Sequence, residues 1–227
     1  SMLIDLGTNG EIVVGNRDGL LCASTAAGPA FEGARISMGM LATTGAISSV
    51  EADQKRWHCR VIGNVHPRGI CGSGLIDAVA VLLDQGFIDA FGQFVGVEER
   101  VILADPVVLT QKDIQEFQLA KAAIATGTEI LMKQLDLQPG DIDTVYIAGA
   151  FGSYINMDQV ISTGMLGFRP GTVRKLGNAA LMGAKMLLFS DLSLPDTILK
   201  ITSHVNLESD PSFQDLFVDH MRFGSGD

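Results

Sequence analysis

A chain of 227 residues that is 47% hydrophobic and 19% charged is long and apolar enough to bury one or two cores, which excludes intrinsic disorder. Its 26 acidic and 16 basic residues give a net charge of -10, which repels nucleic acid and anionic lipid headgroups, so we expect neither nucleic acid nor a membrane as a partner. The mean hydropathy of +0.28 comes with no apolar run of the roughly 18 residues that a membrane-spanning helix needs, and it indicates buried core.

The cysteines and the start of the chain indicate its compartment and extent. Cys22, Cys59 and Cys71 are too few and too scattered for a disulfide framework, and no signal-peptide pattern opens the chain. We therefore expect a cytoplasmic location. Because residues 3–6 already have the pattern of a buried strand, we also expect that a preceding segment has been removed.

A β-hairpin is predicted at the beginning of the chain. Two short apolar runs, residues 3–6 and 11–14, are joined by four turn residues, Gly7, Thr8, Asn9 and Gly10. Asn-Gly is a strong tight-turn signal between strands. A third strand over residues 20–24 then leads through a turn at Gly28 into a helical stretch from about Phe31. This order of elements indicates an α/β fold.

The pattern changes between residues 44 and 105, where short strands precede a glycine-rich helix start. That start contains Gly72, Ser73 and Gly74, and the helix should run through Leu83 and stop near Gly86. We interpret residues 44–105 as an inserted subdomain. The core lobe would then comprise residues 1–43 and 106–227.

A long helix and a strand follow the predicted insertion. Thr110 and Asp113 have the spacing of a capping box, and helical periodicity continues from there until shortly before Pro139. Residues 144–148 form a β-rich run that is broken by a turn containing Gly149, Ala150 and Gly152. A glycine turn at the carboxyl end of a strand is where α/β sheets bind ligands. A further helix, lined with small residues that permit close packing, should open over residues 177–184.

The first hairpin has the residue types of a phosphate site. Asp5 ends a strand, and its carboxylate could hold hydrated Mg²⁺, while the glycines that follow let a phosphate approach the backbone. The alternative is a structural hairpin with a solvent-facing aspartate. Gly72, Ser73 and Gly74 leave two options open as well: anion binding at a helix start, or close packing of the helix against a neighbour.

Two other features have simpler explanations. His58, Cys59, His66 and Cys71 carry metal-binding atoms, but their spacing matches no common metal motif, so no metal site is expected among them. Lys121 interrupts the apolar face of the long helix. A lysine extending from a half-buried face to solvent is the commoner arrangement, and a reach toward a nucleotide is the alternative.

Five segments in order resemble the C-terminal actin-like ATPase region of reductive activators of corrinoid proteins, a branch of the actin, sugar-kinase and chaperone ATPase superfamily. They are Leu-Ile-Asp-Leu-Gly-Thr-Asn-Gly-Glu-Ile (3–12), Ser-Thr-Ala-Ala-Gly-Pro-Ala-Phe-Glu-Gly-Ala (24–34), Gly-Ile-Cys-Gly-Ser-Gly-Leu-Ile-Asp-Ala (69–78), Ile-Ala-Gly-Ala-Phe-Gly (147–152) and Leu-Gly-Asn-Ala-Ala-Leu (176–181). The resemblance covers nearly the whole chain. It implies the ribonuclease H-like second lobe of an actin-like ATPase fold, a mixed sheet flanked by helices with an inserted α/β subdomain.

The resemblance also implies a function. Such activators use ATP to drive electrons from a [2Fe-2S] centre to Co(II) in a corrinoid iron-sulfur protein or a corrinoid methyltransferase subunit. The [2Fe-2S] domain and the first half of the ATPase domain would lie outside this chain. Thr25 stands where related activators have a cluster cysteine, which agrees with a cluster held elsewhere.

By the same resemblance, the core lobe would bind the nucleotide, with Asp5 placing Mg²⁺ or the attacking water and Gly7 to Gly10 cradling the β- and γ-phosphates of ATP. Gly28, in the turn after the third strand, is a further candidate nucleotide-binding residue. Gly149, Ala150 and Gly152 would face adenosine, although Ala150 departs from the usual Gly-Gly pair. The fragment alone is expected to be inactive, and a homodimer stays open because the sequence does not give the oligomeric state. Two alternatives stay open: a small-molecule kinase of the same fold, and a binding lobe that has lost ATP.

Overall fold

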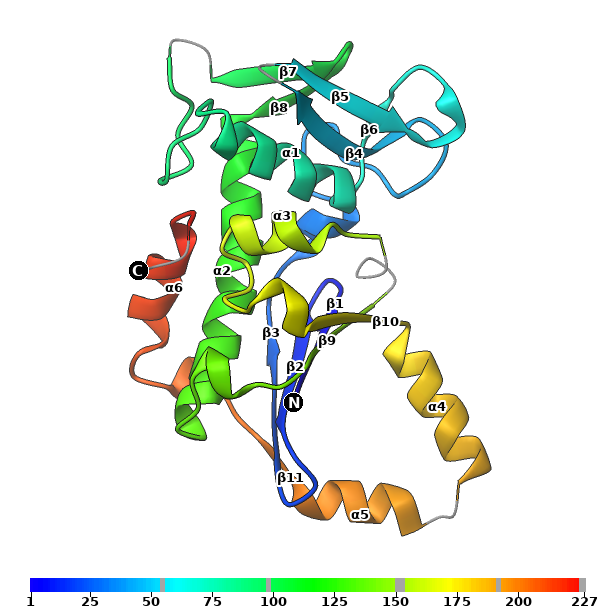
Figure 1. The fold of residues 1–227 in the computed structure, drawn as a ribbon, viewed down its shortest axis with the longest axis vertical. Helices are drawn as coiled ribbons and strands as arrows, with labels where there is room; N and C mark the ends of the chain where they lie inside the picture. The colour runs from blue at the N-terminus through cyan, green and yellow to red at the C-terminus, as the bar shows by residue number, and fades with distance from the viewer. Residues whose placement is uncertain (54–55, 97–98, 150–153, 191–192, 225–227) are drawn as a thin grey trace.

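The computed structural model describes residues 1–53, 56–96, 99–149, 154–190 and 193–224. Its centre is a six-stranded mixed sheet (Figure 1) in the order β10-β9-β1-β2-β3-β11. The strands are β1 (Met2–Leu6), β2 (Gly10–Gly15), β3 (Leu20–Thr25), β9 (Val145–Ala148), β10 (Val173–Gly177) and β11 (Thr202–His204).

Strands β1, β2 and β3 form an antiparallel meander, as the alternating pattern and the Asn-Gly turn predict. β9 pairs with β1 in parallel, β10 pairs with β9 in parallel, and β11 pairs with β3 in parallel. The predicted hairpin and the predicted strand before Gly149 are thus confirmed. The helical stretch expected from about Phe31 is only a short 3₁₀ helix, Pro29–Glu32, because Gly33 adopts φ 82° and turns the chain back against Gly39 and Met40.

Helix α2 (Gln111–Gln134) packs against β2 and β3 and carries much of the core. Its capping box is present: the Thr110 hydroxyl accepts the Asp113 N–H, and Asp113 accepts the Thr110 N–H at 2.8 Å. Asp113 is fully buried and also accepts the N–H and hydroxyl of Ser37. The same side chain therefore caps the helix and fixes the segment that follows β3.

Residues 46–110 form two smaller sheets and a helix at the upper end of the view in Figure 1. One sheet contains β4 (Ala46–Asp53), β5 (Arg56–Val61) and β6 (Gly69–Ile70), and α1 (Gly72–Asp84) packs on it. β7 (Arg100–Ala104) and β8 (Val107–Thr110) form a separate ribbon. β8 continues directly into α2, so the chain passes from this region into the core without a linker.

The α-helices in the described part of the C-terminal third are α3 (Met157–Ser162), α4 (Ala179–Phe189), α5 (Ser193–Ile201) and α6 (Phe213–Met221). α4 stands away from the sheet in Figure 1, and none of its residues is buried. The close packing expected around its small residues is not seen among the described residues, since none of them outside the helix backbone and the chain neighbours of Gly183 comes within 4 Å of where a Cβ of Gly183 would be. Among the described residues, no helix has the length and apolar character needed to cross a bilayer.

Helix α6 lies along α2, and Lys121 of α2 hydrogen-bonds to the backbone at the C-terminal end of α6. Lys121 is 1% exposed, and its ammonium donates to the carbonyl oxygens of His220 at 2.5 Å and Arg222 at 2.6 Å. Both alternatives considered for Lys121 are therefore wrong: it neither reaches solvent nor points to a nucleotide. A cation at the end of α6 satisfies carbonyl groups that have no partner within the helix.

Candidate functional site

The first candidate site is a cavity at the carboxyl ends of three sheet strands. Because β1, β9 and β10 run parallel as neighbours, they end at the same edge of the sheet. A cavity of about 590 Å³, here called the strand-end cavity, lies at this edge. Its wall includes a residue that follows each strand end, Gly7, Gly149 and Asn178. Open α/β sheets bind ligands at this position.

Asp5 lines the strand-end cavity from within β1. Its side chain is partly buried, and burial raises the pKa of its carboxyl group above the usual 3.8. Gly149 approaches it closely: a Cβ atom at Gly149 would lie 2.8 Å from Asp5 Oδ1 and would collide with the Leu6 carbonyl oxygen. With φ at 94°, Gly149 also has a backbone conformation that favours glycine. The ends of β1 and β9 can therefore meet beside Asp5 only because residue 149 has no side chain.

The hairpin turn is fixed by its own chain. The Thr8 hydroxyl donates to the Glu32 carboxylate, 2.8 Å from Oε1 and 2.7 Å from Oε2, and the Gly7 N–H donates to the Asn9 carbonyl oxygen. Glu32 lines the strand-end cavity, whereas Thr8 and Asn9 are exposed beside it. Gly10 is buried, and a Cβ there would lie 2.9 Å from Thr25 Cγ2, so this glycine permits the packing of β2 against β3.

The N-terminus of α1 faces the same cavity. Gly72 and Ser73 line it, and the N-cap residue Cys71 makes no side-chain capping bond, so the first N–H groups of the helix are not capped by that side chain. Gly74 lies one residue further, where a Cβ would collide with the Ile47 carbonyl oxygen. Close packing, one of the two options considered for this glycine-rich start, thus applies to Gly74. Gly72 and Ser73 border the cavity, and anion binding there stays a prediction.

The remaining predicted residues fall outside the strand-end cavity. Gly28 adopts φ 75° at the start of the short helix after β3 and is absent from the cavity wall. Ala150 and Gly152 lie outside the described residues. His58, Cys59, His66 and Cys71 do not assemble, and within the part of the chain that the structure describes no group of three or more potential metal ligands occurs.

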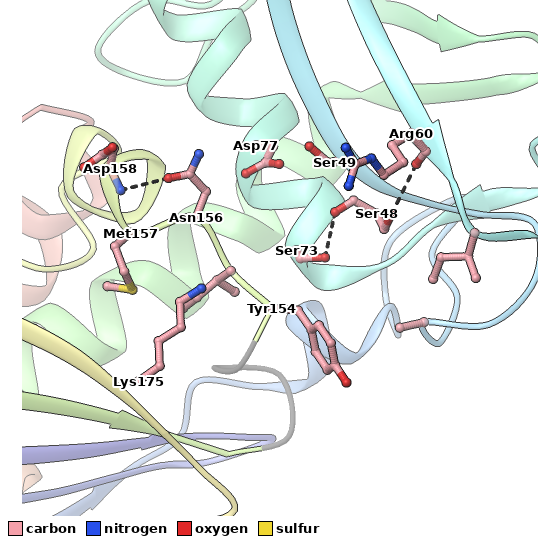
Figure 2. A pocket seen from close by; sticks show the side chains of 13 residues that line it. Ser48, Ser49, Arg60, Ser73, Asp77, Tyr154, Asn156, Met157, Asp158 and Lys175 are labelled. Atoms are coloured by element: carbon pink, nitrogen blue, oxygen red, sulfur yellow. Dashed lines mark hydrogen bonds between the residues drawn. The ribbon is translucent and has the colours of Figure 1, made fainter. Parts of the chain in front are cut away.

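A second cavity of about 840 Å³, here called the Asp77 cavity, adjoins the first. The two share three wall residues, Ala42, Ser73 and Tyr154. In Figure 2 its wall comes from two sides, with Ser48, Ser49, Arg60 and Asp77 of the β4, β5 and α1 region facing Asn156, Asp158 and Lys175 of the core.

Apart from Ser73, the residues of the Asp77 cavity were not predicted from the sequence. One signal was available, because Asp77 is the only charged residue in the apolar run 69–83 that contains α1's first three turns. Asp77 is 5% exposed, and burial is the largest effect on its carboxyl group and raises the pKa. The Ser49 hydroxyl and the Val50 N–H lower the pKa of the Asp77 carboxyl group, which partly offsets the effect of burial.

Comparisons with known proteins identify the family. Residues 1–226 match the family model described as the C-terminal domain of RACo, the ASKHA domain. The chain is 39% identical over 252 residues to the corrinoid activation enzyme RamQ of Eubacterium limosum, covering 98% of this chain and 42% of that protein. It is 30% identical over 247 residues to the [Co(II) methylated amine-specific corrinoid protein] reductase of Methanosarcina barkeri, covering 96% and 45%.

A solved structure of a reductive activator for corrinoid, iron-sulfur protein superposes with a TM-score of 0.85 at 34% identity, covering 98% of this chain and 39% of the other. The chain thus spans less than half the length of these relatives. Sequence and structure agree over nearly all of it, and the fold is the actin-like fold expected from the five sequence segments. The chain belongs to the family of C-terminal ASKHA domains of the reductive activators of corrinoid proteins.

Proposed function

We propose that this chain is the ATP-binding part of a longer reductive activator, which uses ATP to return a corrinoid protein from Co(II) to Co(I). The observation that carries the proposal is the strand-end cavity, where the ends of three parallel strands and the N-terminus of α1 converge on Asp5. Backbone N–H groups at a helix start and a glycine turn suit phosphate oxygens. We infer that the substrate is a corrinoid protein because the relatives are named as a corrinoid activation enzyme and a corrinoid protein reductase.

The residues present fit a magnesium nucleotide. Asp5 and Glu32 bring two carboxylates to the strand-end cavity, and no lysine or arginine is among its described wall residues. A phosphate chain placed there needs a cation to offset this negative charge, and Mg²⁺ bound through water is the hard cation that carboxylates and phosphates hold. Asp5 would orient the metal's water ligands, while Glu32, bonded to Thr8, fixes the turn beside the phosphates.

We assign the two cavities to the two ends of the nucleotide. The phosphates would occupy the strand-end cavity, with Gly7 to Gly10 beside the β- and γ-phosphates, and the nucleoside would extend past Ser73 and Tyr154 into the Asp77 cavity. Gly149, with Ala150 and Gly152 after it, would border the nucleoside. Residues 44–105 act in this proposal as a subdomain that closes one side of the site, against a core of residues 1–43 and 106–227.

The rest of the longer protein would complete the site. The [2Fe-2S] centre and the opposing lobe would lie in the part of the relatives that this chain does not span. α4 supports this, because Leu188 is 80% exposed and Phe189 is 90% exposed, and an all-round apolar helix is normally buried. We place the opposing lobe of the same polypeptide against α4. ATP would then act as a switch between lobe positions, and a homodimer stays compatible with this arrangement.

The test uses the full-length protein with its corrinoid partner in the Co(II) state. ATP consumption should rise when the partner is added and should not respond to sugars or carboxylic acids. Stimulation by one of those small molecules would favour the kinase alternative. Absence of any nucleotide binding by calorimetry would favour a binding lobe that has lost ATP.

A further inference from the structure

Asp77 is an unusual wall residue because part of its carboxylate is buried without a partner. Oδ2 accepts the Val50 N–H at 3.3 Å, a long hydrogen bond. Oδ1 is buried and has no partner at hydrogen-bonding geometry among the described residues, although the Ser49 hydroxyl lies close enough to the carboxylate to lower its pKa. Leaving such an acceptor unpaired is costly, and buried polar groups are nearly always paired. The side chain therefore fits a ligand that donates one hydrogen bond.

The position of Asp77 indicates which part of a ligand would meet it. Asp77 follows Ser73 by one turn of α1, and Ser73 lies where the two cavities join. In Figure 2 the Asp77 side chain projects from α1 toward the segment that carries Asn156. Asp77 therefore lines the cavity assigned to the nucleoside and not the strand-end cavity, which Asp5 lines.

The chemistry of the carboxylate narrows the choice of base. A carboxylate oxygen accepts hydrogen bonds and repels a carbonyl oxygen. Adenine presents a 6-amino group that donates, whereas hypoxanthine and guanine present a 6-oxo group. Guanine offers adjacent N1–H and 2-amino donors that suit both oxygens of one carboxylate, but Oδ2 of Asp77 is already used by Val50. The one carboxylate oxygen of Asp77 without a partner, Oδ1, can accept one hydrogen bond, which the single amino group of adenine can donate.

We propose that Asp77 is a specificity-determining residue that accepts a hydrogen bond from the 6-amino group of adenine and thereby selects ATP over 6-oxo purine nucleotides. This inference rests on the proposed nucleotide site. Asp77 lines the Asp77 cavity, so its carboxylate belongs to the wall that the base would meet. Lys175, which lines the same cavity, favours the ionised carboxylate through its charge.

The experiment measures affinities of the full-length protein for three triphosphates by calorimetry: ATP, inosine triphosphate, and purine riboside triphosphate, which lacks any 6-substituent. We expect ATP to bind most tightly, about 10-fold or more above inosine triphosphate, with purine riboside triphosphate between them. In Asp77→Asn the amide can donate to a 6-oxo group, so the ratio of ATP to inosine triphosphate affinity should fall below about 3-fold.

The matched control is Asp84→Asn, the same chemical change on an exposed residue two turns further along α1, and it should keep the native ratio. Equal affinity of the native protein for ATP and inosine triphosphate, or an unchanged ratio in Asp77→Asn, overturns the role of Asp77 while leaving the nucleotide site intact. Binding of none of the three overturns the nucleotide site itself. If Asp77→Asn does not fold, the three affinities of the native protein decide the matter.

Discussion

Replacing Lys121 with methionine should change how the stability of this chain depends on pH. Burial lowers the pKa of Lys121 from 10.5 to about 8. Below pH 8 the ammonium is charged in both the folded and the unfolded chain, so the cost of burying the charge is paid in full. Between pH 8 and 10.5 the unfolded chain binds more protons than the folded one, so stability rises with pH.

The size of the change in stability with pH follows from the shift in the pKa of Lys121. At 1.36 kcal/mol per unit, the change from 10.5 to about 8 corresponds to about 3 kcal/mol between the two protonation states. The stability of the native chain changes with pH only above about pH 8, so raising the pH from 7 to 9.5 covers about 1.5 pH units of that range. The free energy of unfolding of the native chain should therefore rise by about 2 kcal/mol relative to that of Lys121→Met. Methionine keeps much of the apolar stem packing but cannot titrate.

The assay is urea unfolding of the native chain and Lys121→Met at several pH values from 7 to 9.5. Subtracting the two free energies of unfolding removes the contributions of titratable groups that both chains share. Lys112→Met, at an exposed position near the start of the same helix, is the control and should show no such difference. A native-minus-Lys121→Met difference that stays constant within about 0.5 kcal/mol across this range would refute the reasoning.

Three further predictions concern the strand-end cavity and the isolated chain. Gly149→Val should lower the melting temperature by several degrees, because its side chain would collide with the Leu6 carbonyl oxygen, whereas Gly171→Ala, with no atom near its Cβ, should change it little; equal melting temperatures would contradict this. In the full-length protein Asp5→Asn should reduce ATP turnover by about 100-fold, with nucleotide affinity changed much less, and a native rate in the folded variant would remove the phosphate assignment of the hairpin. The isolated chain should be free of stoichiometric iron and zinc in elemental analysis and should bind ATP more weakly than about 1 μM by calorimetry.

Local sequence signals predicted the elements that depend on local interactions. The Asn9-Gly10 turn, the strand alternation around it and the Thr110-Asp113 capping box each involve residues a few positions apart, and all appear in the structure. The position of the strand-end cavity was predictable because glycine turns, which contain Gly7 and Gly149, follow the buried strands.

Features that depend on distant partners were not predictable. Lys121 bonds to carbonyl groups 99 and 101 positions away, so its burial could not be inferred from the periodicity of its own helix. Asp77 meets a cavity wall that is built partly by residues 154–158 and Lys175. The small residues of α4 predicted close packing, yet no described part of this chain packs against Gly183.

The central claim is tested most directly by following the corrinoid absorbance of the partner protein during reduction. The full-length protein, an electron donor and the Co(II) partner are mixed with and without ATP and Mg²⁺, and the appearance of Co(I) is recorded for the native protein and Asp5→Asn. The account predicts that Co(I) forms in the native protein only when ATP and Mg²⁺ are present, and that Asp5→Asn forms it much more slowly. Formation of Co(I) at the same rate without ATP would contradict the account.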